Sequence, residues 1–340
     1  MILIKRKRGR GGLRPSRLQM LFMMFGIVMA LILSANVASA DRQNPSLNWG
    51  NTTVMDAPIP PPGLYLSNYM VYYTANKLMD GDGDKIKGDY DIDVLVYTPQ
   101  LIYVAKSKIS GLSWGWQALL PIINYSADGY FDTPGAPWGD RLGISDFENN
   151  DVLADLCFGP YIGGVVPFGP NSRLHWFFDF DIYAPIGSYD KKKALNPGYN
   201  AWTLEPFLAL TLQLPYGINV GTRQHFTYNF KNDDYVLDGV EGEMKGGMLY
   251  HFNYDIMKTV DFISPRLQVG LAGYYGIQLN EDEFEGDDIK DSEMRKFAIG
   301  PAIWYVSKGG CVFSLRAYWE DKIKNNPEGQ KVVARIILPF

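Results

Sequence analysis

The residues best suited to chemistry are charged side chains that alternate with apolar ones along several segments of the 340-residue chain. A period of two gives a β-strand one polar face and one apolar face. Opposed charges around a lumen could bias the passage of ions, or they could pair with one another and fill a closed interior. We predict that the following residues line a lumen: Asp155, Asp179, Asp181, Glu205, Arg223, Lys245, Asp255, Arg266, Arg316, Glu320 and Arg335.

Three histidines, His175, His225 and His251, fall on the same rows as these charges. A lipid-hydrolysing enzyme would need a serine–histidine pair with an orienting polar group, and the chain has no G-x-S-x-G nucleophile motif. No two histidines have the local spacing of a zinc site. We therefore expect the histidines to join a polar network, with no catalytic, cofactor or metal site. A lipid hydrolase remains an alternative function.

An acidic segment, Asp80-Gly81-Asp82-Gly83-Asp84, resembles the start of a calcium-binding loop, and Asp91 is the twelfth residue counted from Asp80. Alternate acids can converge on calcium, which takes about six to eight oxygen ligands. However, Lys85 stands where such a loop needs glycine, and no glutamate closes it. We expect a solvated acidic loop, and calcium binding stays open.

These residues must be positioned by strands, and the clearest strand signal is at the end of the chain. The last ten residues contain one apolar row: Val332, Ala334, Ile336, Leu338 and Phe340. A soluble edge strand would not normally expose such a row, whereas a barrel closed in lipid turns its apolar face outward. The terminal Phe340 also resembles the assembly signal of bacterial outer-membrane barrels, which predicts recognition by the barrel-assembly machinery.

From residue 64 onward the alternation predicts twelve strands, with ten or fourteen as the alternatives: 64–76, 91–105, 113–126, 151–166, 173–184, 201–214, 217–230, 243–258, 266–278, 294–307, 311–321 and 331–340. Long loops follow odd strands and short turns follow even ones, which is typical of outer-membrane barrels. The long loops are 77–90, 127–150, 185–200, 231–242 and 279–293. We predict an all-β fold, a transmembrane, antiparallel, up-and-down β-barrel with both chain ends in the periplasm.

The two faces of the strands differ in character. In segment 311–321, Leu315 and Trp319 oppose Arg316 and Glu320. An Arg or Lys that faced lipid at the bilayer midplane would cost about 2–4 kcal/mol, so the charged rows must face the lumen.

Aromatic residues near strand ends fit girdles at the two membrane interfaces, with packing in a soluble core as the alternative. They are Tyr72, Tyr73, Trp114, Trp116, Trp202, Tyr228, Tyr305 and Trp319.

The chain divides into three parts. Residues 1–40 have the features of an export signal peptide, with a basic start, an apolar stretch and the small-residue site Ala38-Ser39-Ala40. A transmembrane anchor is the alternative. Residues 41–63 are polar and proline-rich, and we expect a periplasmic lead-in or partial plug without a helix. Residues 64–340 form the barrel.

Charge and cysteine placement exclude two properties. The signal carries seven of the 32 basic residues and no acidic ones, so its removal leaves 25 basic and 37 acidic residues, a net charge of −12. Such a chain should not bind nucleic acid. The alternation puts Cys157 on an inward row and Cys311 on an outward row, so we expect no disulfide even in an oxidising compartment.

Several short motifs resemble one known family. They are Asp181-Ile-Tyr-Ala-Pro-Ile-Gly-Ser-Tyr189, Asn200-Ala-Trp-Thr-Leu-Glu-Pro206, Phe297-Ala-Ile-Gly-Pro301, Asn326-Pro-Glu-Gly329 and the polar loop Tyr235–Asp238. Together they are similar to a family of bacterial outer-membrane proteins named for the meta-pathway of phenol degradation. Ile186 departs from the pattern, where we would expect threonine. The resemblance implies a barrel that takes up hydrophobic or aromatic compounds.

These observations together predict an outer-membrane channel for the passive uptake of small, aromatic or otherwise hydrophobic solutes. Its expected partners are outer-membrane lipid and lipopolysaccharide, the barrel-assembly machinery and the solute. We expect no enzyme activity and no cofactor. A structural or surface-interaction barrel without a pore is the main alternative, and a lipid hydrolase is the second.

Overall fold

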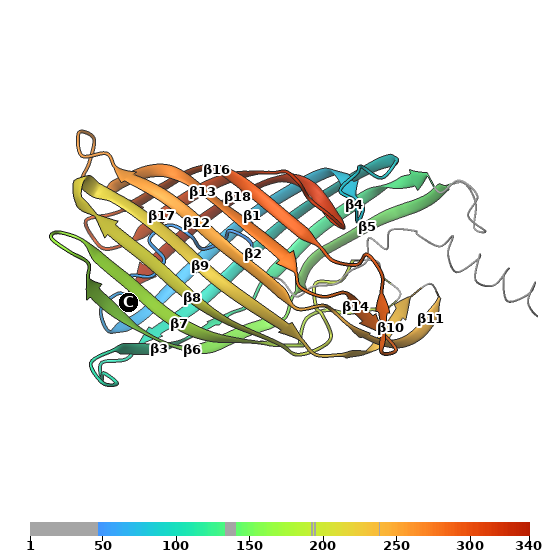
Figure 1. Cartoon of the computed structure of the whole chain (residues 1–340), viewed down its shortest axis with the longest axis horizontal. Coiled ribbons are helices and arrows are strands. Elements are labelled where there is room, and N and C mark those ends of the chain that lie inside the picture. Colours follow the sequence, from blue (N-terminus) through green and yellow to red (C-terminus); the bar gives the residue numbers. More distant parts are fainter. Residues whose placement is uncertain (1–46, 133–140, 192, 194, 238) are drawn as a thin grey trace, which may run out of the picture.

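The computed structural model describes residues 47–132, 141–191, 193, 195–237 and 239–340. Over these residues the chain forms a closed barrel of twelve antiparallel strands, as predicted (Figure 1). Each strand pairs with its neighbours in chain order, which makes the topology up-and-down. No helix among the described residues is long and apolar enough to cross a membrane. The predicted signal peptide, residues 1–40, lies outside the described residues.

Two of the twelve strands are interrupted, so fourteen elements build the wall. They are β1 (Gly63–Met79), β2 (Gly88–Val104), β3 (Ser113–Leu119) continued by β4 (Ile122–Asp132), β5 (Arg141–Leu153) continued by β6 (Leu156–Pro167), β7 (Arg173–Ala184), β8 (Thr203–Leu214), β9 (Ile218–Asn229), β12 (Leu249–Thr259), β13 (Leu267–Gln278), β16 (Arg295–Val306), β17 (Val312–Glu320) and β18 (Asn326–Pro339). A single 3-10 turn, η1 (Pro215–Gly217), joins β8 to β9.

The barrel closes between its first and last strands. β1 pairs with β2 on one side and with β18 on the other, and the β1–β18 register runs from Tyr65 opposite Pro339 to Met79 opposite Asn326. Closure leaves no row of unpaired backbone groups between β1 and β18, which is the condition for a sheet to lie in hydrocarbon. Among the described wall elements only β5 pairs on one side alone, with β4.

One predicted loop, 127–150, is largely strand, and this prediction was wrong. β4 runs to Asp132 and β5 begins at Arg141, and the two pair with each other while β4 also pairs with Gly88–Tyr97 of β2. Turn-like residues such as Gly129 misled the sequence interpretation. Gly129 has φ +139° and its α-carbon lies so close to Asp89 that a Cβ would meet that carbonyl oxygen at 2.1 Å, so glycine serves strand pairing here.

Two other predicted loops contain short strands. β10 (Asn232–Leu237), β11 (Val240–Lys245), β14 (Asp282–Phe284) and β15 (Asp287–Ile289) form a separate four-stranded sheet. This loop sheet lies at the same end of the barrel as the β4–β5 extension, opposite the end that holds the C-terminus (Figure 1). Below, the two ends are called the loop end and the turn end.

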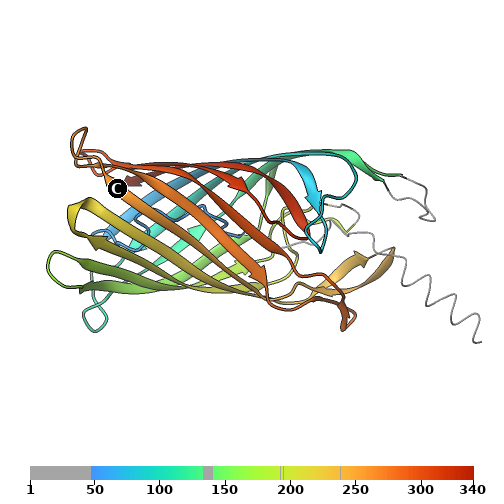
Figure 2. The same cartoon turned by 45° about the horizontal axis from the view of Figure 1, so that its top comes forward.

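The wall separates two environments. Leu315 on β17 is 47% exposed on the outer face, whereas Arg316 beside it is 1% exposed inside. Phe180 and Asp181 on β7 differ in the same way, at 36% and 2%. Residues 47–62, which precede β1, lie inside the barrel and occupy part of its interior (Figure 2). We call these residues the lead-in segment.

Candidate functional site

The lead-in segment is held by polar side chains that point inward from the wall. Asn253 of β12 accepts a hydrogen bond from the backbone N–H of Gly50 at 2.8 Å and donates to the carbonyls of Asn48 and Thr52 at 3.0 and 3.1 Å. From β17, Arg316 donates to the carbonyl of Asn51 at 2.7 Å. These contacts satisfy backbone groups that would otherwise be buried without partners, and they fix the segment against the wall.

A buried ion triad crosses the lumen at the centre of this arrangement. Arg223 Nη1 of β9 lies 2.9 Å from Asp56 Oδ2 of the lead-in segment, and Arg335 Nη1 of β18 lies 3.6 Å from Asp56 Oδ1. The three side chains are only 6%, 11% and 7% exposed for Arg223, Arg335 and Asp56. The Arg223 guanidinium also stacks 3.6 Å from the centre of the Phe207 ring. Asp56 therefore ties two distant strands to the lead-in segment.

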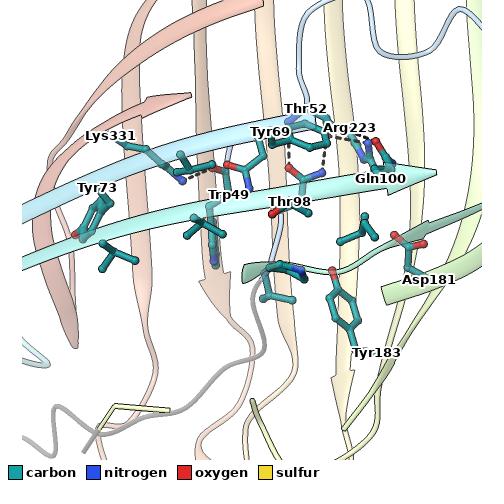
Figure 3. A pocket seen from close by; sticks show the side chains of 18 of the residues that line it. Trp49, Thr52, Tyr69, Tyr73, Thr98, Gln100, Asp181, Tyr183, Arg223 and Lys331 are labelled. Atoms are coloured by element: carbon teal, nitrogen blue, oxygen red, sulfur yellow. Dashed lines mark hydrogen bonds between the residues drawn. The ribbon is translucent and has the colours of Figure 1, made fainter. Parts of the chain in front are cut away.

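Cavities lie on both sides of this triad. The first, of about 220 Å³, is lined by Trp49, Tyr69, Tyr73 and Tyr183, together with charged residues of both signs (Figure 3). It lies toward the loop end. Its charged lining residues are Asp181, Arg223, Lys296, Glu320 and Lys331.

The second cavity, of about 280 Å³, lies toward the turn end. Its lining is more apolar, with aromatic side chains that include Tyr161, Phe177 and Trp304, and its charged residues are Asp56, Arg223 and Arg335. Gln100 and Arg223 line both cavities. The described part of the lumen therefore contains two chambers that meet at the level of the lead-in segment, here called the outer chamber and the inner chamber.

A chain of amides connects the chambers. Tyr69 donates to Gln100 Oε1 at 3.0 Å, Gln100 Nε2 donates to Gln117 Oε1 at 2.6 Å, and Gln117 Nε2 donates to Asp181 Oδ1 at 2.9 Å. Since each amide is both donor and acceptor, the chain fixes the orientation of all four side chains. Polar groups at this level are thus set in place rather than free to turn.

The structure places nine of the eleven predicted lumen residues inside the wall. Asp179, Asp181, Glu205, Arg223, Asp255, Arg316 and Glu320 are buried on inward rows, Arg335 is half-buried there, and Asp155 is buried between β5 and β6. They do not all meet in one site. Glu320 accepts hydrogen bonds from Tyr73 and Tyr274 at 2.9 and 2.7 Å, whereas Asp155 accepts from the backbone of Gly187 and Tyr199 and so anchors a loop.

The remaining two lie outside the lumen, which corrects their predicted position. Lys245 is the last residue of β11 in the loop sheet, where its Nζ pairs with Glu283 Oε1 at 3.1 Å. The predicted strand 243–258 is broken at Gly246 and Gly247, because the backbone of Gly247 hydrogen-bonds Asp282 instead of a barrel strand. Arg266 is exposed in the turn before β13, so the predicted strand began one residue too early.

Sequence reasoning missed the lead-in contacts and two lysines that line the outer chamber, Lys296 and Lys331. Asp56 and Arg223 are 167 residues apart in sequence, and nothing local marks their pairing. Lys331, which donates to the carbonyl of Trp49 and lies 4.7 Å from the Tyr274 ring centre, shares the alternation of Arg335 on β18. That alternation could have identified it as a lumen residue.

The acidic turn, His175 and the two cysteines were the remaining candidates, and the contacts of the first two are structural. Asp80 Oδ1 accepts hydrogen bonds from the backbone of Asp82, Gly83 and Asp84 at 3.0, 2.9 and 2.9 Å, so this carboxylate caps its own turn. His175 lies near the turn end, 2.9 Å from Gln213 Oε1. Cys157 is buried on the inner face, Cys311 precedes β17, and both are free thiols.

The family of the chain is established by its sequence. Residues 75–336 match the family described as "Putative MetA-pathway of phenol degradation". The chain belongs to this family. The match runs from the end of β1 into β18 and so includes at least part of every barrel strand. No curated protein is similar enough in sequence to match the chain.

Solved structures show the fold of this family member. An outer membrane channel from Pseudomonas putida F1 is 17% identical, with a TM-score of 0.68, and the similarity covers 84% of this chain and 98% of that one. The β domain of the Bordetella autotransporter BrkA is 12% identical, with a TM-score of 0.45, over 82% of this chain and 100% of that one. The first similarity shows that this chain has the same barrel fold.

Proposed function

We propose that this family member is an outer-membrane channel for the passive entry of small solutes that are aromatic or otherwise hydrophobic. The observation that carries the proposal is the pair of chambers in line within a closed barrel, of about 220 and 280 Å³. Their walls combine aromatic rings with a few oriented polar groups, as small-molecule sites usually do. The structural similarity to an outer membrane channel supports a transport role.

The charges of the chambers favour anions and neutral aromatics over cations. The outer chamber has three basic lining residues and two acidic ones, and the inner chamber has two basic residues and one acidic one. Several cations already lie against rings, such as Arg335 at 4.8 Å from the Tyr69 centre. A solute with an aromatic ring and a negative group could contact the basic side chains with either its ring or its charge.

The proposed orientation and partners follow from the same architecture. We propose that both chain ends lie in the periplasm and the loop end outside, which the predicted signal peptide and the even strand number support. Val332 and Ile336 on the outward row of β18 are 41% and 39% exposed, and Phe340, directly after the strand, is 77% exposed. This apolar end supports recognition of the strand by the barrel-assembly machinery and contact with outer-membrane lipid. Lipopolysaccharide would contact the wall near the loop end.

Reversal potentials in planar bilayers under a salt gradient test this proposal. The wild-type channel should conduct with a preference for anions. Lys296→Gln should reduce that preference and Asp181→Asn should increase it, because both residues line the outer chamber. Lys106→Gln is the matched control, since Lys106 is exposed in the turn after β2. A bilayer that stays silent would contradict the channel and favour a structural barrel.

A further inference from the structure

We propose that Glu205, His225 and His251 form a binding site for a divalent transition-metal ion of the zinc class. The three side chains come from adjacent strands β8, β9 and β12, and His225 stands directly opposite His251 in the β9–β12 register. One ligand atom from each residue lies within 4.8 Å of the other two, and all three side chains are completely buried. This inference goes beyond the transport proposal and does not depend on it.

The spacing of the ligand atoms fits a single ion. Nδ1 of His225 lies 2.9 Å from Glu205 Oε1, and Nε2 of His251 lies 3.5 Å from Glu205 Oε2. Around a tetrahedral zinc ion with bonds of about 2.0–2.1 Å, neighbouring ligand atoms are about 3.3 Å apart. The imidazole rings of His225 and His251 stack at 4.2 Å with 10° between their planes, which keeps the two ligands side by side.

The donor set selects the class of ion. Two imidazoles and one carboxylate suit zinc, and also copper, nickel and iron, according to geometry and availability. Calcium and magnesium prefer sites made of oxygen alone. A fourth position would be taken by water or by the hydroxyl of Thr227, which already donates to Glu205 Oε2 at 2.8 Å.

Neighbouring residues orient the Glu205 carboxylate and add a second negative charge that a bound cation would offset. Tyr183 donates to Glu205 Oε1 at 3.3 Å, which together with Thr227 fixes the carboxylate. Asp181 of β7 stands directly opposite Glu205 in the β7–β8 register. Like charges at opposed positions destabilise a sheet, and a bound divalent cation would offset that repulsion.

The outer chamber gives the ion a route. Trp49 and Tyr183 line that chamber, and each also contacts the cluster: the Trp49 ring lies 4.5 Å from His251 between ring centres, and Tyr183 hydrogen-bonds Glu205. Trp49 and Tyr183 therefore lie between the cluster and the outer chamber. Because Trp49 belongs to the lead-in segment, an ion that rigidifies His251 would also stabilise the position of that segment.

Titration of the untagged, refolded full chain in detergent with Co²⁺ tests the proposal. Four-coordinate Co²⁺ absorbs visible light strongly and the hydrated ion does not, so the wild type should develop a strong band that saturates at one ion per chain and is lost when Zn²⁺ is added. Glu205→Gln and His251→Gln should weaken binding by more than about tenfold. His175→Gln is the matched control, because His175 lies near the turn end, bonded to Gln213.

The absence of a band in the folded wild type, or a band that is unchanged in His251→Gln, would overturn the proposal. Should the cluster variants fail to fold, X-ray absorption of the Zn²⁺-loaded wild type gives an independent answer. The expected spectrum has two imidazole nitrogens and oxygen at about 2.0–2.1 Å. A sulfur ligand, which would point to Cys157, or a shell of oxygen alone would refute the assignment.

Discussion

Single residues in the lumen show how a barrel interior accommodates charge. Asp56 accepts from Arg223 and faces Arg335, and Arg223 also donates to Thr52 Oγ1 at 2.8 Å while covering the Phe207 ring. Removing one partner of a buried ion pair costs about 3–5 kcal/mol, because the other charge stays buried and unpaired. In this protein the ion pair joins the wall to the lead-in segment, so its loss should destabilise the position of that segment more than the wall.

The variant Asp56→Asn should therefore loosen the lead-in segment while leaving the barrel intact. Without the Asp56 carboxylate, the guanidiniums of Arg223 and Arg335 would repel each other across the lumen. The lead-in segment would also lose its ion pairs to β9 and β18. We expect single-channel conductance to rise several-fold and anion preference to increase. Asp261→Asn, at an exposed position in the turn after β12, should leave conductance unchanged. Equal conductance in wild type and Asp56→Asn would contradict this role.

At the same scale, local sequence could predict which side chains face inward but not their partners. The alternation on β17 separates Arg316 from Leu315 without any structure. The cluster of His225 and His251 depends on how the β9–β12 hairpin is aligned, and the intervening loop contains two strands that no pattern had indicated. The sequence spacing of these histidines does not resemble that of a zinc site, because strand pairing and not sequence proximity brings them together.

At the level of elements, the sequence predicted the twelve barrel strands well and their ends less well. Strand number follows from alternation and from the turn residues between segments, and both are local. The extension β4–β5 was missed because its pairing uses glycine and polar residues that resemble a loop. In the loop sheet, β14 and β15 were missed because they have three residues each, too few for a period to show.

The sidedness of the strands gives a direct energetic prediction. Leu271 lies near the middle of β13 and is 48% exposed on the outer face. Leu271→Arg should lower the free energy of unfolding from lipid vesicles by about 2–4 kcal/mol, because the guanidinium would face hydrocarbon. Leu279→Arg is the matched control: Leu279 is equally exposed at 48% but follows the end of β13, where the cost should be about 0–1 kcal/mol. Equal losses in urea titrations would contradict the assignment of the outer face.

At the level of the whole molecule, the barrel and the lead-in segment have different functions. The wall is closed by β1 and β18 and presents apolar residues outward. The lead-in segment adds no strand, yet six wall strands contribute polar contacts to it: β1, β8, β9, β12, β17 and β18. A barrel of twelve strands would otherwise leave a wider lumen. The segment reduces that lumen to two chambers of solute size.

Flux of a matched pair of aromatic ions into liposomes tests the central claim most directly. Vesicles of bacterial phospholipid that hold the refolded full chain should take up benzenesulfonate faster than phenyltrimethylammonium, since the chambers carry aromatic rings and an excess of basic residues. Both ions keep their charge at all working pH values and cross protein-free bilayers slowly. Uptake of benzenesulfonate no faster than in protein-free vesicles would contradict the account.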